Sequence, residues 1–333
     1  MKNKIIISTL LALGISVSTV AFANASDKAT NEDWDKPIFI QGKDLEGESL
    51  EKTKQELNVN SKYEKFFVNV NDVQKYVPNT GNLSYIHSSA TIERKKFGKG
   101  VDVDIKTPDN ITQVTTDQYR NVAITAGIEN SNISIASIDP VTGEGALAGI
   151  YKVYSIKGDS LNQQDMENAN KEIQDISQIS KENKEQNQEG YSDEALNASI
   201  ADIKQQLAEI RSKQDEQLTD KQVKNTVDEV LKNNGLSEIL NDNQKKIITE
   251  NMRNVASSNS LNKNPKGFES QAKDLSNSIQ KNAGDKLDKA KEFINSDEGK
   301  SWGHKIWDIL KNIIDSLLDL IDRIISFLQN LFK

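Results

Sequence analysis

The stretch Asn110–Ser155, NITQVTTDQYRNVAITAGIENSNISIASIDPVTGEGALAGIYKVYS, predicts a helix, a strand and a second helix in close succession. The first helix begins at Thr115–Asp117, where a hydroxyl can cap the free amides and an acidic side chain follows. It ends at Gly127, a residue suited to a left-handed cap. β-branched side chains across Ile133–Ile138 predict the strand. After a turn, Ala146–Tyr154 predicts the second helix, and the whole stretch is expected to form the centre of a globular domain.

The residues before this stretch predict further strands and helices, so that 36–157 should form an α+β domain, a small mixed sheet with packed helices. Strictly alternating apolar residues in Val101–Ile105 predict a strand with one buried face and one carboxylate-rich face. The other expected elements are strands at Ile38–Ile40 and Leu83–Glu93, an apolar run at Phe66–Val70, and helices at Ser49–Leu57 and Val73–Val77. A hairpin turn is expected at Phe97–Gly100, between the strands Leu83–Glu93 and Val101–Ile105.

After Gly158 the strand signals stop, and residues 158–258 predict an all-α helical region. Ser192 is expected to cap one helix, and Thr219 with Gln222 forms a capping box for the next. The apolar stripes of these helices are narrow, which favours pairwise, coiled-coil-like packing. Ser257–Gly267, rich in Ser, Asn, Pro and Gly, predicts a linker, so that residues 259–333 would comprise this linker and a C-terminal helix.

The C-terminal stretch Trp302–Phe332 predicts a long amphipathic helix with a broad apolar face. Aspartates recur along it, which argues against a membrane span. Each large apolar side chain gains about 1.5–3 kcal/mol on burial, so the face needs cover. Three kinds of surface could cover this apolar face: the protein's own helices, a second copy or an envelope partner, and a membrane surface. The residues expected to make the partner or membrane contact are Trp302, Trp307, Ile314, Leu318, Ile325 and Phe332.

The amino terminus predicts export. A basic start and an apolar run precede small residues at Ala23 and Ala25, so residues 1–25 are expected to be a signal peptide cleaved near one of them, with an uncleaved anchor as the alternative. Residues 26–35 are polar and predict a disordered spacer. The chain contains no cysteine, as is common among proteins exported by Gram-positive bacteria. We therefore expect a secreted or cell-surface protein.

Composition and motifs exclude several classes of site. The net charge of the 333 residues is −8, which argues against nucleic-acid binding. Without cysteine there is no thiolate nucleophile or disulfide, and no zinc, calcium or phosphate-loop motif is present, so we predict no metal, no cofactor and no catalytic residue. His87 and Ser88 are neighbours, but adjacent strand residues point to opposite faces, so we expect them not to act as a base and nucleophile.

The best candidate for a ligand site is the loop Asp139–Gly145, which joins a strand to a helix start where anions often bind. Its candidate residues are Asp139, Thr142, Gly143 and Gly145, with the glycines allowing a ligand or another backbone to approach. Glu144 would repel an anion, and a helix cap explains the same residues equally well. Thr115 and Thr116 are similar candidates. The carboxylates Glu93, Asp102, Asp104 and Asp139 could alternatively supply an acid–base pair.

The block Thr115–Tyr154 resembles the signature of the YpuA-like family, secreted Gram-positive proteins of unknown function. The resemblance also includes Ile40–Leu45, Ser88–Ala90, Gly98–Val103 and the helical region, and so covers most of the mature chain. Family members tend to read Ser-Gly-Thr-Ala-Ala where this chain has Thr142–Ala146. The resemblance implies export and this domain layout, and it implies no reaction.

Our leading hypothesis from the sequence is an exported, non-catalytic cell-envelope protein that binds or associates through its α+β domain and its C-terminal helix. Two alternatives remain. One is an envelope hydrolase that uses carboxylates near Asp139 and Glu93. The other is a membrane-surface-active protein that uses the last helix.

Overall fold

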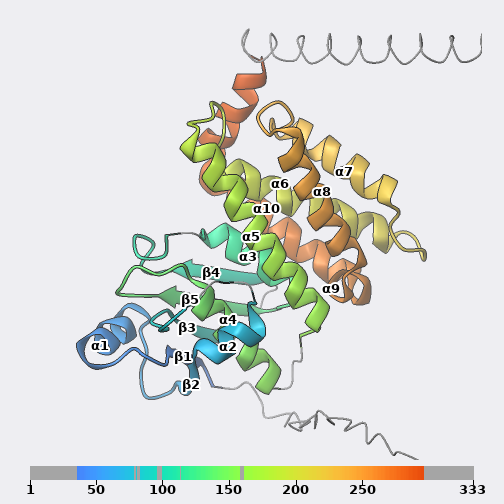
Figure 1. Ribbon diagram of the computed structural model, residues 1–333. Coiled ribbons are helices and arrows are strands. Elements are labelled where there is room, and N and C mark those ends of the chain that lie inside the picture. The colour runs from blue at the N-terminus through green and yellow to red at the C-terminus, as the bar shows by residue number, and fades with distance from the viewer. Residues whose placement is uncertain are drawn as a thin grey trace, which may run out of the picture.

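The computed structural model describes residues 36–78, 80, 83–95, 100–112, 114–157 and 161–295, and it confirms the α+β class (Figure 1). Its centre is a five-stranded mixed sheet with the strand order β2-β1-β3-β5-β4. The strands are β1 (Ile38–Gly42), β2 (Glu64–Val68), β3 (Ser89–Arg94), β4 (Val101–Ile105) and β5 (Ser131–Ala136).

The pairing of the strands corrects one prediction. β1 and β2 are parallel, β4 and β5 are parallel, and β3 runs antiparallel to both β1 and β5. The predicted hairpin between Leu83–Glu93 and Val101–Ile105 is therefore wrong. β4 instead pairs with β5, because α3 (Thr116–Thr125) carries the chain back so that both strands run in the same direction. The strand predicted from Leu83 starts only at Ser89.

Helices cover the apolar face of the sheet. Alternate strand residues such as Ile40, Ile92 and Val103 pack against α3 and α4 (Glu144–Ile156), while α2 (Val70–Tyr76) packs on α4. The predicted alternation in β4 is confirmed, with its valines buried and its aspartates exposed. On the opposite face, α1 (Gly47–Glu56) covers one end through a small cluster around Phe39.

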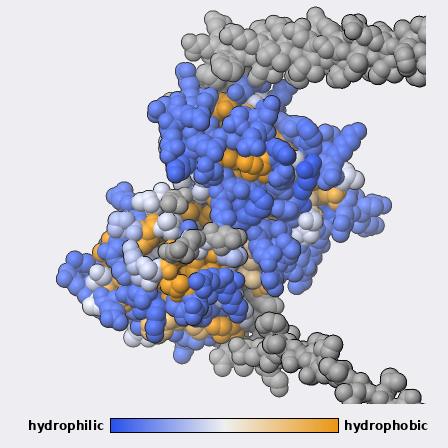
Figure 2. Space-filling view, in the orientation of Figure 1, coloured by the Kyte–Doolittle hydropathy of each residue, from blue (hydrophilic) through white to orange (hydrophobic). Residues whose placement is uncertain are grey.

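The helical part packs directly onto the sheet part. Its members are α5 (Gln163–Glu185), α6 (Asp193–Ser212), α7 (Asp220–Asn233), α8 (Asp242–Ser257), α9 (Asn259–Lys263) and α10 (Pro265–Asn295). α3 has side chains in both hydrophobic clusters: Tyr119 and Val122 lie in the sheet cluster, and Ile124 lies in the helical cluster. Ile173 of α5 likewise packs into the sheet cluster. Figure 2 shows mostly hydrophilic residues over the helical part and more hydrophobic ones on the sheet part.

The predicted linker Ser257–Gly267 is wrong, because this stretch contains α9 and the start of α10. The hydroxyl of Ser258 caps α9 by accepting a hydrogen bond from the Leu261 amide, and Pro265 begins α10, where a missing N–H costs nothing. Leu261 and Phe268 are buried in the helical cluster. Their burial stabilises helices that the polar composition obscured. The helix starts predicted at Ser192 and Thr219 are confirmed.

Several predictions concern parts of the chain that lie outside the described residues. These are the signal peptide at 1–25, the spacer at 26–35, most of the turn at 97–100 and the amphipathic helix at 302–332. Among the helices that the structure does describe, none combines the length and the apolar character that a membrane crossing requires.

Candidate functional site

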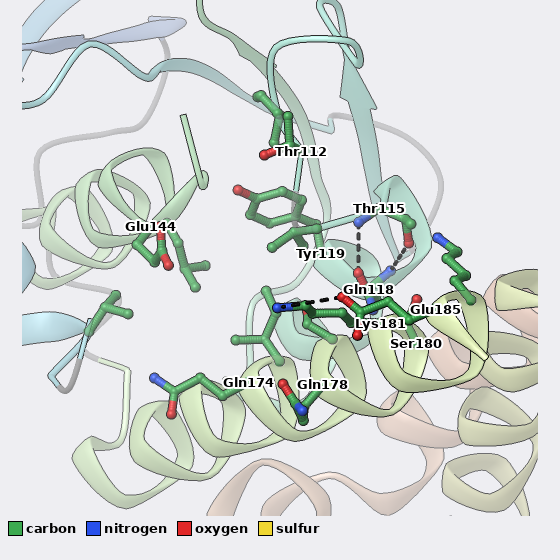
Figure 3. Close-up of a pocket in the computed structure, with 17 residues that line it drawn as sticks. Thr112, Thr115, Gln118, Tyr119, Glu144, Gln174, Gln178, Ser180, Lys181 and Glu185 are labelled. Atoms are coloured by element: carbon green, nitrogen blue, oxygen red, sulfur yellow. Dashed lines mark hydrogen bonds and ion pairs between the residues drawn. The ribbon is translucent and has the colours of Figure 1, made fainter. Parts of the chain in front are cut away.

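Two clefts flank the first turn of α4. The larger, the α5 cleft, has a volume of about 540 Å³ and lies between the starts of α3 and α4 on one side and α5 on the other (Figure 3). It is lined by Val77, Ile111, Thr112, Val114, Thr115, Gln118, Tyr119, Glu144, Leu147, Ile173, Gln174, Ser177, Gln178, Ser180, Lys181, Lys184 and Glu185. This volume lies in the range of small-molecule sites.

Thr115 and Gln118 form one wall of the α5 cleft because they make the capping box of α3. The Thr115 hydroxyl accepts from the Gln118 amide at 3.2 Å, and Gln118 Oε1 accepts from the Thr115 amide at 2.7 Å. Gln118 is thereby fixed with its carboxamide oxygen engaged. Its Nε2 is buried and has no hydrogen-bond partner within the described chain. Of the two predicted threonines, Thr115 lines this cleft and Thr116 does not.

Glu144 forms the α4 side of the cleft. The backbone before it is set by Gly143, which has a φ of 108° and whose carbonyl accepts from the Tyr119 hydroxyl at 3.0 Å. The Glu144 carboxylate accepts a hydrogen bond from the hydroxyl of Thr142. Burial raises the pKa of Glu144, so the cleft disfavours negative charge at this wall.

The α5 wall is polar, and its charges are paired. Lys181 lies 3.9 Å from Glu185, and Lys184 pairs with Asp193. Ser177 also lines the cleft, and its hydroxyl is buried without a partner in the described part of the chain. Sequence reasoning did not predict this wall, because Gln, Ser and Lys spread over several turns of a helix look like an ordinary solvated face.

The second cleft, the His87 cleft, has a volume of about 300 Å³ and lies on the other side of the α4 start. It is lined by Leu83, Ser84, Tyr85, Ile86, His87, Ser88, Pro140, Val141, Thr142, Gly143 and Gly145. His87 Nδ1 lies 2.6 Å from the Oδ2 atom of Asp139, a pair that sequence reasoning missed because 52 residues separate its members. Three of the predicted ligand residues, Thr142, Gly143 and Gly145, line this cleft, and Asp139 contacts it through His87.

The close approach that we expected at Gly145 is made by the chain itself. A Cβ atom at Gly145 would lie 2.6 Å from Ser88 Oγ and 2.7 Å from Ile86 Cγ2. The Ser88 hydroxyl also accepts a hydrogen bond from the Ala146 amide at 3.0 Å. His87 contacts Asp139 and Ser88 contacts α4, so the two neighbours make separate contacts, as the sequence predicted.

The structure does not bring the predicted carboxylates together. β5 ends at Ala136, which pairs with Ser89, and Asp139 lies three residues beyond that end. Glu93 lies four residues from Ser89 in the other direction, and this step along β3 alone is roughly 13 Å at the usual rise of a strand. Glu93 accepts from the Tyr63 hydroxyl, while Asp102 and Asp104 pair with Lys95 and Lys106. Paired glycosidase carboxylates lie about 5–9.5 Å apart, so the Asp139–Glu93 arrangement does not match that chemistry.

A buried polar network lies behind the α5 cleft and joins α3, α5 and α6. Lys204, which is completely buried, donates to Glu172 Oε1 at 2.6 Å and to the Asn121 carbonyl at 2.8 Å. The Thr125 hydroxyl donates to the other oxygen of Glu172 at 2.6 Å. Burial lowers the pKa of Lys204, opposed by the attraction of Glu172. This network fixes α5 against α3 and so holds the two walls of the cleft in place.

The family model described as "Protein of unknown function (DUF1002)" matches residues 41–275. The chain belongs to the DUF1002 family. The match confirms the resemblance to YpuA-like proteins and covers both clefts of this DUF1002 protein. The chain is also similar to the uncharacterized protein YpuA of Bacillus subtilis (strain 168), at 25% identity over 224 residues, 63% of this chain and 75% of that protein. No solved structure matches significantly.

Proposed function

We propose that this DUF1002 protein is an exported, non-catalytic binding protein of the cell envelope and that its ligand occupies the α5 cleft. The family carries no assigned reaction. The proposal therefore depends on one observation: two residues that line the cleft each have a buried polar atom, Gln118 Nε2 and Ser177 Oγ, without a hydrogen-bond partner among the described residues.

Those two atoms support binding because buried polar groups nearly always have hydrogen-bond partners. Leaving one without a partner costs about 1–3 kcal/mol. Gln118 is only 2% exposed, and its carboxamide is held by the capping box, so its Nε2 cannot turn away to reach water. A ligand that supplied partners to both atoms would recover that free energy on binding.

The charges around the cleft indicate an uncharged ligand. Glu144 disfavours an anion, and the lysines of α5 are already paired with carboxylates. The remaining polar groups are carboxamides and hydroxyls, which match amide or hydroxyl groups of a ligand. Ile111, Leu147 and Ile173 add an apolar floor. The best match is therefore a neutral compound with amide or hydroxyl groups and an apolar part.

Fragment screening by protein-observed NMR tests this proposal. We expect primary amides or polyols to shift resonances of α3 and α5. Ser177→Leu, which places an apolar side chain in the cleft, should abolish the shifts. Gln163→Leu, at an exposed position on the same helix, is the matched control and should leave them unchanged. If no fragment binds at α3 and α5, or if binding survives Ser177→Leu, the cleft is not the ligand site.

Export and association are proposed on the sequence features alone. Cleavage near Ala23 or Ala25 would release the chain to the surface or the medium, and N-terminal sequencing of the protein from intact cells tests it. The helix expected at 302–332 would mediate self-association, an envelope contact or a peripheral membrane contact. Deleting residues 302–333 should alter the oligomeric state or the retention in the envelope. An unchanged monomer released to the medium at the same level would contradict this.

A further inference from the structure

We propose that the His87 cleft is a second binding site, and that it takes an uncharged carbohydrate ring. This inference goes beyond the α5 cleft, because the two clefts flank the first turn of α4 and have no lining residue in common. It depends on three observations: an oriented imidazole, an exposed aromatic ring beside it, and a cavity of about 300 Å³ in which both are found.

The imidazole contacts Asp139, and the backbone on both sides of this contact is held by hydrogen bonds. On the His87 side, the Ile86 amide donates to Asp44 Oδ2 at 2.8 Å, and the carbonyl of His87 accepts from the Ser89 hydroxyl at 3.2 Å. On the other side, the carbonyl of Asp139 accepts from the Ser137 hydroxyl at 2.7 Å. A side chain held in this way loses little conformational freedom when a ligand binds, which favours affinity.

The contact with Asp139 determines what the imidazole offers to a ligand. With Nδ1–H donating to the carboxylate, a neutral imidazole has its acceptor at Nε2. The main-chain amide of Gly145, in the first turn of α4 where no intrahelical acceptor exists, adds a donor at the same cleft. A hydroxyl group both donates and accepts, so neighbouring hydroxyls fit this mixture. A carboxylate or phosphate would meet the negative charge of Asp139 at the same cleft.

Tyr85 supplies the apolar surface that distinguishes a sugar from a simpler polyol. Its side chain is 51% exposed, and its ring centroid lies 4.7 Å from that of His87 at an angle of 46°. Aromatic side chains that keep one apolar face open commonly mark binding surfaces. A pyranose has an apolar face of C–H groups and an edge of hydroxyls, so it can contact Tyr85 while its hydroxyls reach His87.

The same cleft does not support acyl transfer through a serine. Ser88, the hydroxyl nearest to His87 in sequence, is 3% exposed and is engaged by the Ala146 amide. A nucleophile needs its hydroxyl within hydrogen-bond reach of the base, and Ser88 is held on the α4 side instead. In the described ranges, no three His, Asp or Glu side chains come together as a metal-ion site would require. The geometry therefore favours binding.

Isothermal titration with soluble oligosaccharides tests the inference on the full chain without residues 1–25. The probes are chito-, cello- and malto-oligosaccharides, with dextran sulfate as the charged comparator. We expect at least one neutral oligosaccharide to bind. Tyr85→Ala and His87→Ala should each lower the affinity by about tenfold or more, which corresponds to roughly 1.4 kcal/mol. Asp139→Asn should weaken binding less, because the amide oxygen of asparagine can still accept from Nδ1–H and the ring itself is kept.

Phe67→Ala is the matched control. Phe67 is 40% exposed, as an aromatic residue outside the cleft, and its ring lies near Lys43 and Lys65. It should leave the affinity unchanged, and so should Ser177→Leu, which changes only the α5 cleft. The inference is overturned if none of the neutral oligosaccharides binds, if dextran sulfate alone binds, or if binding is indifferent to Tyr85→Ala and His87→Ala. Circular dichroism spectra matching the unsubstituted protein establish that each variant is folded.

Discussion

Replacing Lys204 with methionine removes the cation at the centre of the buried network between α3, α5 and α6. Methionine has a similar length, so the packing volume is nearly kept and the change is mainly electrostatic. Glu172, whose side chain is 2% exposed, would keep its bond from Thr125 and lose its counter-ion. Breaking a buried pair in this way costs about 3–5 kcal/mol, a large part of the stability of most proteins of this size. Glu172→Met should cost a similar amount.

The double substitution K204M/E172M should be much less destabilising than the sum of the two. It removes both charges together and leaves the Thr125 hydroxyl and the Asn121 carbonyl less well satisfied, at a cost of about 2 kcal/mol in total. The two single changes add to roughly 6–10 kcal/mol, so the coupling between the positions should be about 4 kcal/mol or more. Lys224→Met, in an exposed pair with Asp228, is the control and should cost less than about 1 kcal/mol.

Urea unfolding followed by circular dichroism measures all four variants. The free energies of unfolding are comparable if the dependence on urea concentration keeps the same slope. Additive effects of Lys204→Met and Glu172→Met would refute the argument, and so would a loss below about 1 kcal/mol for Lys204→Met. In either case the pair would be reached by water, and α3 would not be tied to α5 by a desolvated charge.

Three further predictions concern the first turns of α3 and α4. Gly143→Ala should destabilise the protein by about 1–3 kcal/mol in the same urea assay, because φ at this position is 108° and a Cβ atom would lie 2.2 Å from the Tyr119 hydroxyl. An unchanged midpoint of unfolding would show that α4 can start with a different backbone conformation. Thr115→Ala should cost about 1 kcal/mol through the lost cap, whereas Thr115→Ser should restore most of it. Burial raises the pKa of Glu144. Between the ordinary and the raised pKa, the folded state therefore binds more protons than the unfolded state. The free energy of unfolding should consequently fall as the pH rises through that interval. Glu144→Gln should remove this part of the pH dependence, and identical pH profiles for both proteins would contradict it.

Local signals in the sequence predicted most of the helices and strands. They could not predict which strands pair with each other, because that depends on contacts between distant parts of the chain. Capping chemistry located the starts of α3, α6 and α7 because a cap acts within four residues. The alternation in Val101–Ile105 likewise revealed the buried face of β4. Which strand β4 would join depends on the crossover through α3, and no local pattern encodes that choice, so a hairpin was wrongly expected.

In the candidate site, too, the residues in turns and caps were predictable from the sequence and their distant partners were not. Thr115, Thr142, Gly143 and Gly145 were recognised from turn chemistry, and all four line a cleft. The partners that give the clefts their character come from distant parts of the chain. His87 reaches Asp139 across 52 residues, and Ser177 lies on a helix that the sequence placed in a separate region. The first contact is set by the pairing of β3 with β5 and the second by the packing of α5 against α3, and no local motif encodes either.

Because α3 contributes side chains to both hydrophobic clusters, it determines which fragments of this protein can fold on their own. A gene fragment that ends after residue 157 would expose Ile124 and the neighbouring α3 surface, while one that starts there would leave Ile173 and Ala169 without the sheet they cover. Either fragment would aggregate when produced alone, because its exposed apolar surface would have no cover. The family match runs from residue 41 to residue 275 and so crosses residue 157 without a break. This is expected if the sheet and the helices are inherited together as one folding unit.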